Sequence, residues 1–259
     1  MESFSIKFFL KDTISLFFYL ITYLFPAGNK IAVLAYHSVD PDQTFIDPWR
    51  MNLHPVQFEN HLKFLSRYKG KFAITFDDGY KNNFTYAYPL LQKYGFKATF
   101  FVTTDFIDGK ISSKDIWPVT KPFEPLSQEE IKKMSDNGME IGSHAKTHMH
   151  FLNMDPASIE HEVGYSKKRI EQITGKEVVS FAYPISIPMN KSRQLADILK
   201  KYGYKKAYVK TMGLNDGNLK DAFSLKRIRI YKEDNLFRLQ MKIRGAYNWV
   251  DFRATASRY

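Results

Sequence analysis

The chain has 259 residues and no cysteine, and its 38 Lys and Arg against 27 Asp and Glu give a net charge of +11. This length can bury a substantial core without disulfides, in one large α/β domain or two small ones. Thiolate nucleophiles and cysteine-bound metals are excluded, so any metal chemistry must use His, Asp and Glu. The charge favours either an anionic partner such as a phospholipid surface or a merely solvated basic surface. We expect no nucleic-acid binding, because no Arg-rich tract or nucleic-acid motif is present.

The first 28 residues form a separate apolar segment. Its apolar run covers residues 14–25, interrupted only by Ser15 and Thr22, and is shorter than the roughly 20 residues that span a bilayer. A signal peptide is disfavoured, because Phe25 stands where cleavage after Ala27 requires a small residue. We therefore predict that residues 1–28 form a retained membrane-associated helix at the cell envelope, with the side of the membrane left open. The alternative is a helix that packs on the core of the domain.

From residue 29 to residue 259, short apolar runs alternate with longer amphipathic stretches, as in one parallel α/β domain. The predicted strands are 31–36, 72–76, 98–103, 139–143, 178–183, 206–209 and 226–230. The predicted helices are 55–68, 82–94, 127–137, 156–174, 191–202 and 234–243. Ser127 and Pro156 are typical helix starts, and Gly175 is a typical helix end. Residues 105–126 are predicted to be a long loop that shapes a cleft. The alternation predicts a barrel or an open doubly wound sheet.

Polar side chains follow five of the predicted strands at the point where each strand ends. The residues are His37, Asp77 with Asp78, Thr104 with Asp105, His144, and Tyr183 with Pro184. Parallel α/β folds place their functional sites at this edge, because the loops after the strands converge there. The sequence therefore predicts a site at the carboxyl ends of the strands.

Two segments contain the residues for hydrolytic metal chemistry: residues 75–79 (Thr-Phe-Asp-Asp-Gly) and 143–148 (Ser-His-Ala-Lys-Thr-His). A catalytic zinc ion usually takes three ligands from His, Asp or Glu, and a water occupies the fourth position. One Asp and two His would meet that number and leave the second Asp free to act as a base. Either segment alone is also typical of an ordinary turn or a chance pair of histidines, so the prediction depends on their combination.

These two segments, together with residues 181–184 (Phe-Ala-Tyr-Pro), resemble motifs of the polysaccharide deacetylases with a NodB homology domain, also called carbohydrate esterase family 4. The resemblance covers residues 31–230. Residues 36–39 (Tyr-His-Ser-Val) and 181–184 look most like the subgroup that deacetylates poly-β-1,6-N-acetylglucosamine. The resemblance implies a deformed (β/α) barrel with about seven parallel strands, preceded here by the N-terminal apolar helix.

Carried over to this sequence, the resemblance implies that Asp78, His144 and His148 hold a divalent metal and that Asp77 is the general base. Zinc is the first choice of metal, with cobalt or nickel as alternatives.

The resemblance also assigns substrate and oxyanion binding to the segment after the fifth strand. The residues are Tyr183, Pro184 and Ile185, and the oxyanion donor is the backbone N–H of Ile185.

Two departures from the family pattern concern the catalytic residues. Ala182 stands where many members have an Arg that orients the base, and Arg227 is our candidate substitute, because it shares a strand face with Arg229. An exterior basic stripe is the alternative for this pair. No His follows His161, although the family usually has a late His as general acid. His37, at the mouth of the predicted barrel, is the candidate substitute.

The sequence as a whole predicts a metal-dependent hydrolase that removes the N-acetyl group from N-acetylhexosamine units of a polysaccharide or lipid-linked glycan. Its predicted partners are this N-acetylated glycan and a membrane surface. The missing Arg and late His leave two alternatives open: a catalytically weak glycan-binding or assembly protein on the same fold, or an O-acetyl esterase.

Overall fold

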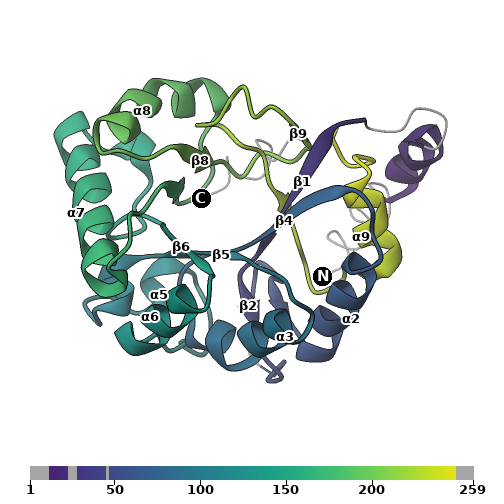
Figure 1. Ribbon diagram of the computed structural model, residues 1–259, viewed down its shortest axis with the longest axis horizontal. Helices are drawn as coiled ribbons and strands as arrows, with labels where there is room; N and C mark the ends of the chain where they lie inside the picture. The colour runs from purple at the N-terminus through teal and green to yellow at the C-terminus, as the bar shows by residue number, and fades with distance from the viewer. Residues whose placement is uncertain (1–11, 23–27, 45–46, 249–259) are drawn as a thin grey trace.

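The structure is a computed structural model that describes residues 12–22, 28–44 and 47–248. Its centre is a parallel sheet curled into a half-barrel (Figure 1). In spatial order its strands are β10 (Ile228–Arg229), β1 (Lys30–Tyr36), β4 (Lys71–Phe76), β5 (Thr99–Val102), β6 (Glu140–Ser143), β7 (Ser180–Ala182) and β8 (Lys206–Tyr208). All seven predicted strands are therefore present, with ends shifted by a few residues. The short strand β9 (Asn215–Asp216) adds an antiparallel partner to β1.

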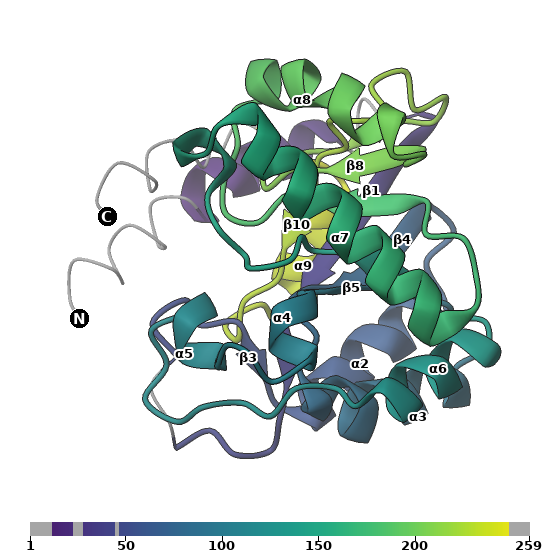
Figure 2. The same cartoon turned by 90° about the vertical axis from the view of Figure 1, so that its left-hand side faces the viewer.

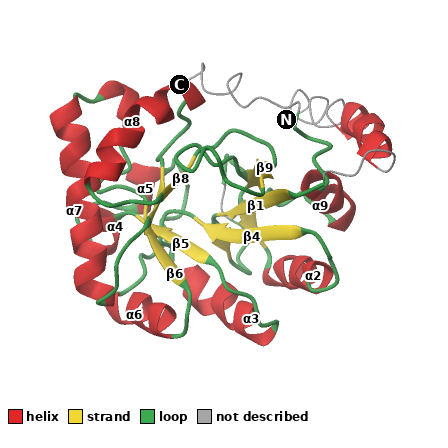
Figure 3. Cartoon of the chain, turned by 45° about the horizontal axis from the view of Figure 1, so that its top comes forward, coloured by secondary structure: helices red, strands yellow, loops and turns green. Residues whose placement is uncertain are grey.

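Helices lie around the outside of the sheet (Figure 3). The six predicted helices correspond to α2 (Pro55–Leu65), α3 (Tyr88–Lys93), α6 (Gln128–Asp136), α7 (Pro156–Thr174), α8 (Met189–Lys201) and α9 (Leu236–Ile243). Because helices cover the sheet, its strands are apolar over most of their length, and the rings of Phe76 and Phe100 on β4 and β5 stack with centroids 4.8 Å apart.

The helix ends form where the local sequence indicates them. Ser127 accepts a hydrogen bond from the backbone N–H of Glu130, and the Glu130 carboxylate accepts one from the backbone N–H of Ser127, so α6 begins with a reciprocal capping box. Asp155 caps α7 immediately before Pro156. Gly175 ends α7 with a φ of 69°, a conformation that costs glycine little.

The predicted continuous helix over residues 82–94 is wrong at its start. Residues Asn83–Ala87 form a π-helix (η1) that leads into α3. The buried Asn83 side chain donates a hydrogen bond of 2.9 Å to the carbonyl oxygen of His37. Wider π turns of this kind often occur beside functional sites, and this one joins the start of the helix to the end of β1.

The predicted long loop over residues 105–126 is also more ordered than expected. It contains α5 (Ser113–Ile116), and α4 (Thr104–Ile107) begins one residue before it. A small parallel pair, β2 (Ser38–Val39) and β3 (Asn52–Leu53), was not predicted. Figure 2 shows α5 and β3 at the same end of the molecule. Residues of β2, β3 and the end of α5 line a small cavity together with His37.

The N-terminal segment is described only in part: residues 12–22 are helical, and the rest of the predicted 1–28 segment lies outside the described residues. Tyr19 is buried, with its ring 5.7 Å from that of Phe237 on α9, and Arg238 on α9 binds Asp12. Phe17 and Leu20 are 63% and 59% exposed. Among the described residues, no helix is both long enough and apolar enough to span a membrane.

Gly142 provides a stability test for the strand that leads to the site. A Cβ atom added there would lie 2.5 Å from Cδ1 of Phe101 on β5 and 2.6 Å from Oγ of Ser180 on β7. We expect Gly142→Ala to lower the free energy of unfolding by about 1–3 kcal/mol, because the added methyl group would force the side chains of Phe101 and Ser180 to move. Urea denaturation measures this change, and an unchanged midpoint would contradict the packing described here.

Candidate active site

The predicted polar residues converge at the carboxyl edge of the half-barrel. Asp77 and Asp78 follow β4, His37 follows β1, and His144 follows β6. His148 lies farther along the loop after β6, and all five side chains are buried. Two carboxylates and three imidazoles are therefore removed from water in one place, which is costly unless each charge has a partner or a ligand.

The side chains of Asp78, His144 and His148 form a cluster that suits a metal ion. Nε2 of His144 lies 3.5 Å from Oδ1 of Asp78, and Nε2 of His148 lies 3.6 Å from the same oxygen. These three buried atoms have no hydrogen-bond partner among the described residues. Buried polar atoms rarely lack partners, so three that face one another fit the donor set of a divalent cation.

Neighbouring groups hold these three side chains in place. Nδ1 of His144 bonds the carbonyl oxygen of Ala182 at 2.7 Å, which directs Nε2 toward the cluster. The indole N–H of Trp117 donates to Oδ2 of Asp78 at 2.7 Å, which leaves Oδ1 for a cation. The sequence analysis did not predict this bond, because Trp117 comes from the end of α5 and belongs to no motif.

Glu162 on α7 holds the loop between the two histidines. Its buried carboxylate accepts hydrogen bonds from the backbone N–H groups of Lys146 and Thr147 at 2.9 and 2.8 Å, and a third from the Thr147 hydroxyl at 2.8 Å. The sequence analysis missed this residue too, since one Glu within a long amphipathic helix is normally a solvated residue.

Four residues at the site have left-handed backbone conformations that side chains rarely adopt. Their φ angles are 75° at Asp78, 64° at Ala145, 62° at His148 and 54° at Ile185. Each such residue costs roughly 1–2 kcal/mol relative to an ordinary conformation. Strain of this kind persists where the surrounding structure enforces it, and it concentrates at functional sites.

Asp77 lies beside the cluster and is paired with Arg227. Nη1 of Arg227 donates to Oδ1 of Asp77 at 2.6 Å, and both side chains are almost fully buried. Burial alone would raise the pKa of Asp77, but the guanidinium and the nearby imidazoles hold it below its ordinary value. Oδ2 of Asp77 has no hydrogen-bond partner among the described residues, so an anionic oxygen faces the cluster.

His37 lies between Asp77 and Trp117. Its Nε2 is 3.7 Å from Oδ2 of Asp77, and neither ring nitrogen has a hydrogen-bond partner in the described part of the chain. Burial lowers the pKa of His37 to about 4, which outweighs the opposing effect of Asp77 and Asp78. The imidazole is therefore neutral at neutral pH, with one nitrogen as donor and the other as acceptor.

The three predicted residues after β7 differ in their burial and hydrogen bonding. Tyr183 is buried, and its hydroxyl donates to the carbonyl oxygen of Ser192 at 3.1 Å, so it supports the fold rather than facing the cluster. Pro184 is buried, and Ile185 is partly exposed. Ile185 has a left-handed φ of 54°, and its backbone N–H has no hydrogen-bond partner among the described residues.

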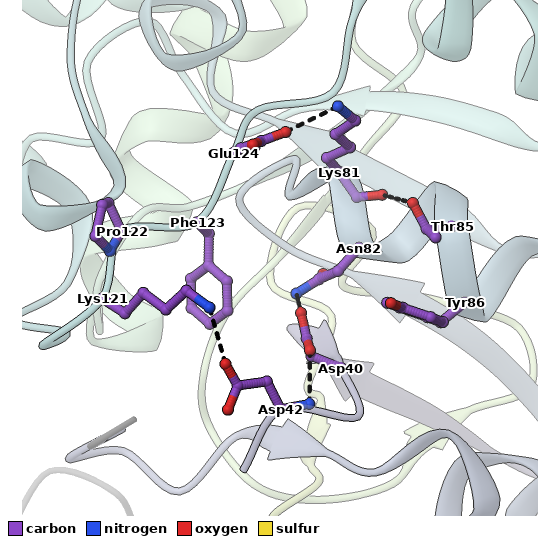
Figure 4. A pocket seen from close by; sticks show the side chains of 10 residues that line it. All are labelled: Asp40, Asp42, Lys81, Asn82, Thr85, Tyr86, Lys121, Pro122, Phe123 and Glu124. Atoms are coloured by element: carbon purple, nitrogen blue, oxygen red, sulfur yellow. Dashed lines mark hydrogen bonds and ion pairs between the residues drawn. The ribbon is translucent and has the colours of Figure 1, made fainter. Parts of the chain in front are cut away.

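A cavity among the described residues lies apart from this site. It measures about 280 Å³, and none of its ten lining residues belongs to the predicted set. Figure 4 shows Lys121 paired with Asp42 and Lys81 paired with Glu124 beside Phe123. The chemistry of the buried cluster, and not cavity size, therefore identifies the candidate active site.

The Asp77–Arg227 pair can be tested through stability. Arg227→Met should lower the free energy of unfolding by about 3–5 kcal/mol, because it leaves the buried carboxylate without its counter-charge. Chemical denaturation measures this loss. Arg193→Met is the matched control: Arg193 pairs with Asp221 where both side chains are more than half exposed, so the change should stay within about 0.5 kcal/mol. Equal effects of the two substitutions would contradict the assigned importance of the buried pair.

Sequence comparisons agree with this geometry. Residues 66–207 match the family model for polysaccharide deacetylases. YxkH of Bacillus subtilis (strain 168), a proposed polysaccharide deacetylase, is 26% identical over 222 residues, which cover 78% of this chain and 71% of YxkH. The peptidoglycan-N-acetylmuramic acid deacetylase PdaA of the same strain is 31% identical over 105 residues, which cover 40% of this chain and 34% of PdaA.

Solved structures show the same architecture. A polysaccharide deacetylase from Bacillus cereus superposes with a TM-score of 0.68 at 27% identity, covering 83% of this chain and 69% of that chain. IcaB from Ammonifex degensii superposes with a TM-score of 0.66 at 21% identity, covering 84% and 98% respectively, a likeness of fold alone. The deformed (β/α) barrel predicted from the sequence is confirmed.

Proposed function

Because the chain belongs to the polysaccharide deacetylase family, whose members are hydrolases that act on N-acetyl groups, we propose that it is a metal-dependent N-deacetylase. Its substrate is the N-acetylhexosamine of a polysaccharide or lipid-linked glycan, and its products are acetate and a free amine. The observation that carries this proposal is that three buried ligand atoms and Oδ2 of Asp77 meet, and that none of the four has a hydrogen-bond partner among the described residues.

Asp78, His144 and His148 would hold the metal. When bound, a divalent cation supplies Lewis-acid chemistry, since it polarises the acetamide carbonyl and makes water more acidic. We propose zinc, because two imidazole nitrogens and one carboxylate are a usual donor set for catalytic zinc, and cobalt or nickel can occupy similar sites.

Two residues beside this cluster transfer protons: Asp77 is the base and His37 is the acid. Asp77 accepts the proton of the attacking water, and Arg227 keeps its carboxylate anionic and correctly oriented. The backbone N–H of Ile185 donates to the oxyanion that develops on the acetamide oxygen. His37 donates a proton to the leaving nitrogen. Its position beside Asp77 supports this role, as does the lack of a hydrogen-bond partner for either ring nitrogen in the part of the chain that the structure describes.

A glycan substrate is supported by the relatives. The B. cereus protein is a polysaccharide deacetylase by name, and the name of PdaA specifies the N-acetylmuramic acid of peptidoglycan. These names describe those proteins. For this chain they support an acetylated hexosamine within a polymer as the substrate class.

Two substitutions separate the base from the metal ligands. Asp77→Asn should abolish measurable acetate release from N-acetylglucosamine oligomers, because an amide cannot accept the proton of the attacking water. Zinc binding should persist, because residue 77 is not one of the proposed ligands. His148→Ala should lose both zinc binding and acetate release. Acetate assays and metal analysis of the purified variants provide the measurements. Wild-type turnover in either variant would contradict the mechanism.

We also propose that the enzyme works at a membrane surface of the cell envelope. The helix over residues 12–22 buries Tyr19 against α9 and presents Phe17 and Leu20 outward, and Leu236 and Phe237 of α9 are 43% and 48% exposed. An apolar face on a chain of net charge +11 suits an anionic lipid headgroup layer. Such a location would bring the site close to a lipid-linked or envelope glycan.

Vesicle binding tests this location. The full chain should sediment with vesicles that contain phosphatidylglycerol, and the double variant Phe17→Asp and Leu20→Asp should bind at least about tenfold more weakly, because it places two charges on the apolar face. Val56→Asp on α2, where Val56 is 58% exposed, is the matched control and should bind like the wild type. Equal sedimentation of all three proteins would contradict a role for this face.

A further inference from the structure

A small cavity adjoins the proposed catalytic base. It measures about 10 Å³, which is room for about one water molecule. Its lining residues are Ala35, His37, Asp77, Lys210, Arg227 and Arg229. Three of these residues have buried polar atoms without a hydrogen-bond partner in the described structure: both ring nitrogens of His37, Oδ2 of Asp77 and Nζ of Lys210.

Lys210 is the unexplained member of this group. It follows β8, is only 5% exposed, and belongs to no motif. Its Nζ lies 4.6 Å from the centroid of the Trp117 ring, the ring that also donates to Asp78. Lysine is rarely buried without a partner, because removing an ammonium from water is costly. A buried lysine that has no hydrogen-bond partner in the described part of the chain and lies beside a catalytic base therefore indicates a functional role.

His37 cannot complete the reaction alone. It is neutral at neutral pH and carries a single N–H proton. If that proton moves to the leaving nitrogen, the imidazole becomes an anion unless its other nitrogen gains a proton in the same event. The second proton must come from a donor that His37 can reach. Asp77, once it holds the proton of the attacking water, is one such donor. Lys210, which lines the same water-sized cavity, is the other.

We propose that Lys210 is the proton source for the leaving amine and that His37 passes the proton on. This inference rests on the proposed deacetylase function. In the tetrahedral adduct the C–N bond breaks, its electron pair stays on nitrogen, and that nitrogen takes the N–H proton of His37. The other nitrogen of His37 takes a proton from the cavity water, which takes one from the Lys210 ammonium. Lys210 becomes a neutral amine and regains its proton from solvent after the products leave.

The charges around Lys210 suit this role. Burial lowers its pKa to about 7, Arg229 and Arg227 lower it as well, and the carboxylates of Asp77 and Asp78 oppose this effect. His37 and His148 also face this charge, and Lys210 contributes to lowering the pKa of each. A donor whose pKa lies near the working pH is often protonated and releases its proton readily.

Two substitutions at Lys210 distinguish a proton donor from a fixed charge. Lys210→Arg keeps a cation that can contact Trp117 but cannot release a proton, whereas Lys210→Met removes the charge. If Lys210 donates the proton, both variants should lower kcat for acetate release from N-acetylglucosamine oligomers by about 100-fold or more. Lys205→Met, an exposed position beside β8, is the matched control and should keep wild-type kcat.

The pH profile gives a second readout. The donor is active when protonated, so wild-type kcat should fall as the pH rises through the pKa of Lys210, and this alkaline fall should be absent from the residual activity of both variants. Zinc content and circular dichroism should match the wild type.

Near wild-type kcat in Lys210→Arg, with activity lost only in Lys210→Met, would overturn the proposal in favour of a fixed charge. Full activity in both variants would also overturn it. A wild-type enzyme that releases no acetate would instead contradict the proposed function itself.

Discussion

The buried pair of Asp77 and Arg227 is the interaction on which the arrangement of the site depends. Asp77 follows β4 and Arg227 precedes β10, and β1 lies between these two strands, so the pair connects two strands that do not touch. A carboxylate at this depth is tolerable only beside a buried cation. The pairing fixes the backbone at Asp77 and therefore also at Asp78, the next residue, which belongs to the metal cluster. One contact thus positions the base and the first ligand together.

The second and third ligands depend on different supports. Ala182 on β7 orients His144, and Glu162 on α7 holds the loop that leads to His148. These supports come from separate elements of the half-barrel, yet they act on atoms within 4.8 Å of one another. The left-handed backbone at Asp78 and His148 is the local cost of this convergence. A rigid site of this kind keeps its donors aimed at the reacting atoms before substrate arrives, which is where most electrostatic catalysis originates.

The sequence predicted those parts of the structure that follow from local pattern. Apolar runs located all seven parallel strands, because strands covered by helices are continuously apolar, and the polar residues after them marked the edge where the site lies. The family resemblance implied an Arg that orients the base, Arg227 was the candidate for that place, and its hydrogen bond to Asp77 is present. Trp117, Glu162 and Lys210 could not be predicted in the same way. Each reaches the site through the tertiary path of its own element, and none has neighbours in sequence that reveal its burial.

The pair that closes the site joins residues 150 positions apart, and this separation has a consequence for how the protein is made. Synthesis proceeds from the N-terminus, so β1, β4, β5 and β6 leave the ribosome well before residue 227. During that interval Arg227 is not yet available to pair with the carboxylate of Asp77. The early strands can pair with one another and pack against their helices, but the edge of β1 that pairs with β10 stays exposed to solvent. We therefore expect the last step of folding to be the docking of the segment that contains β10 against β1, a long-range contact that is slow to form because a large loop must close first.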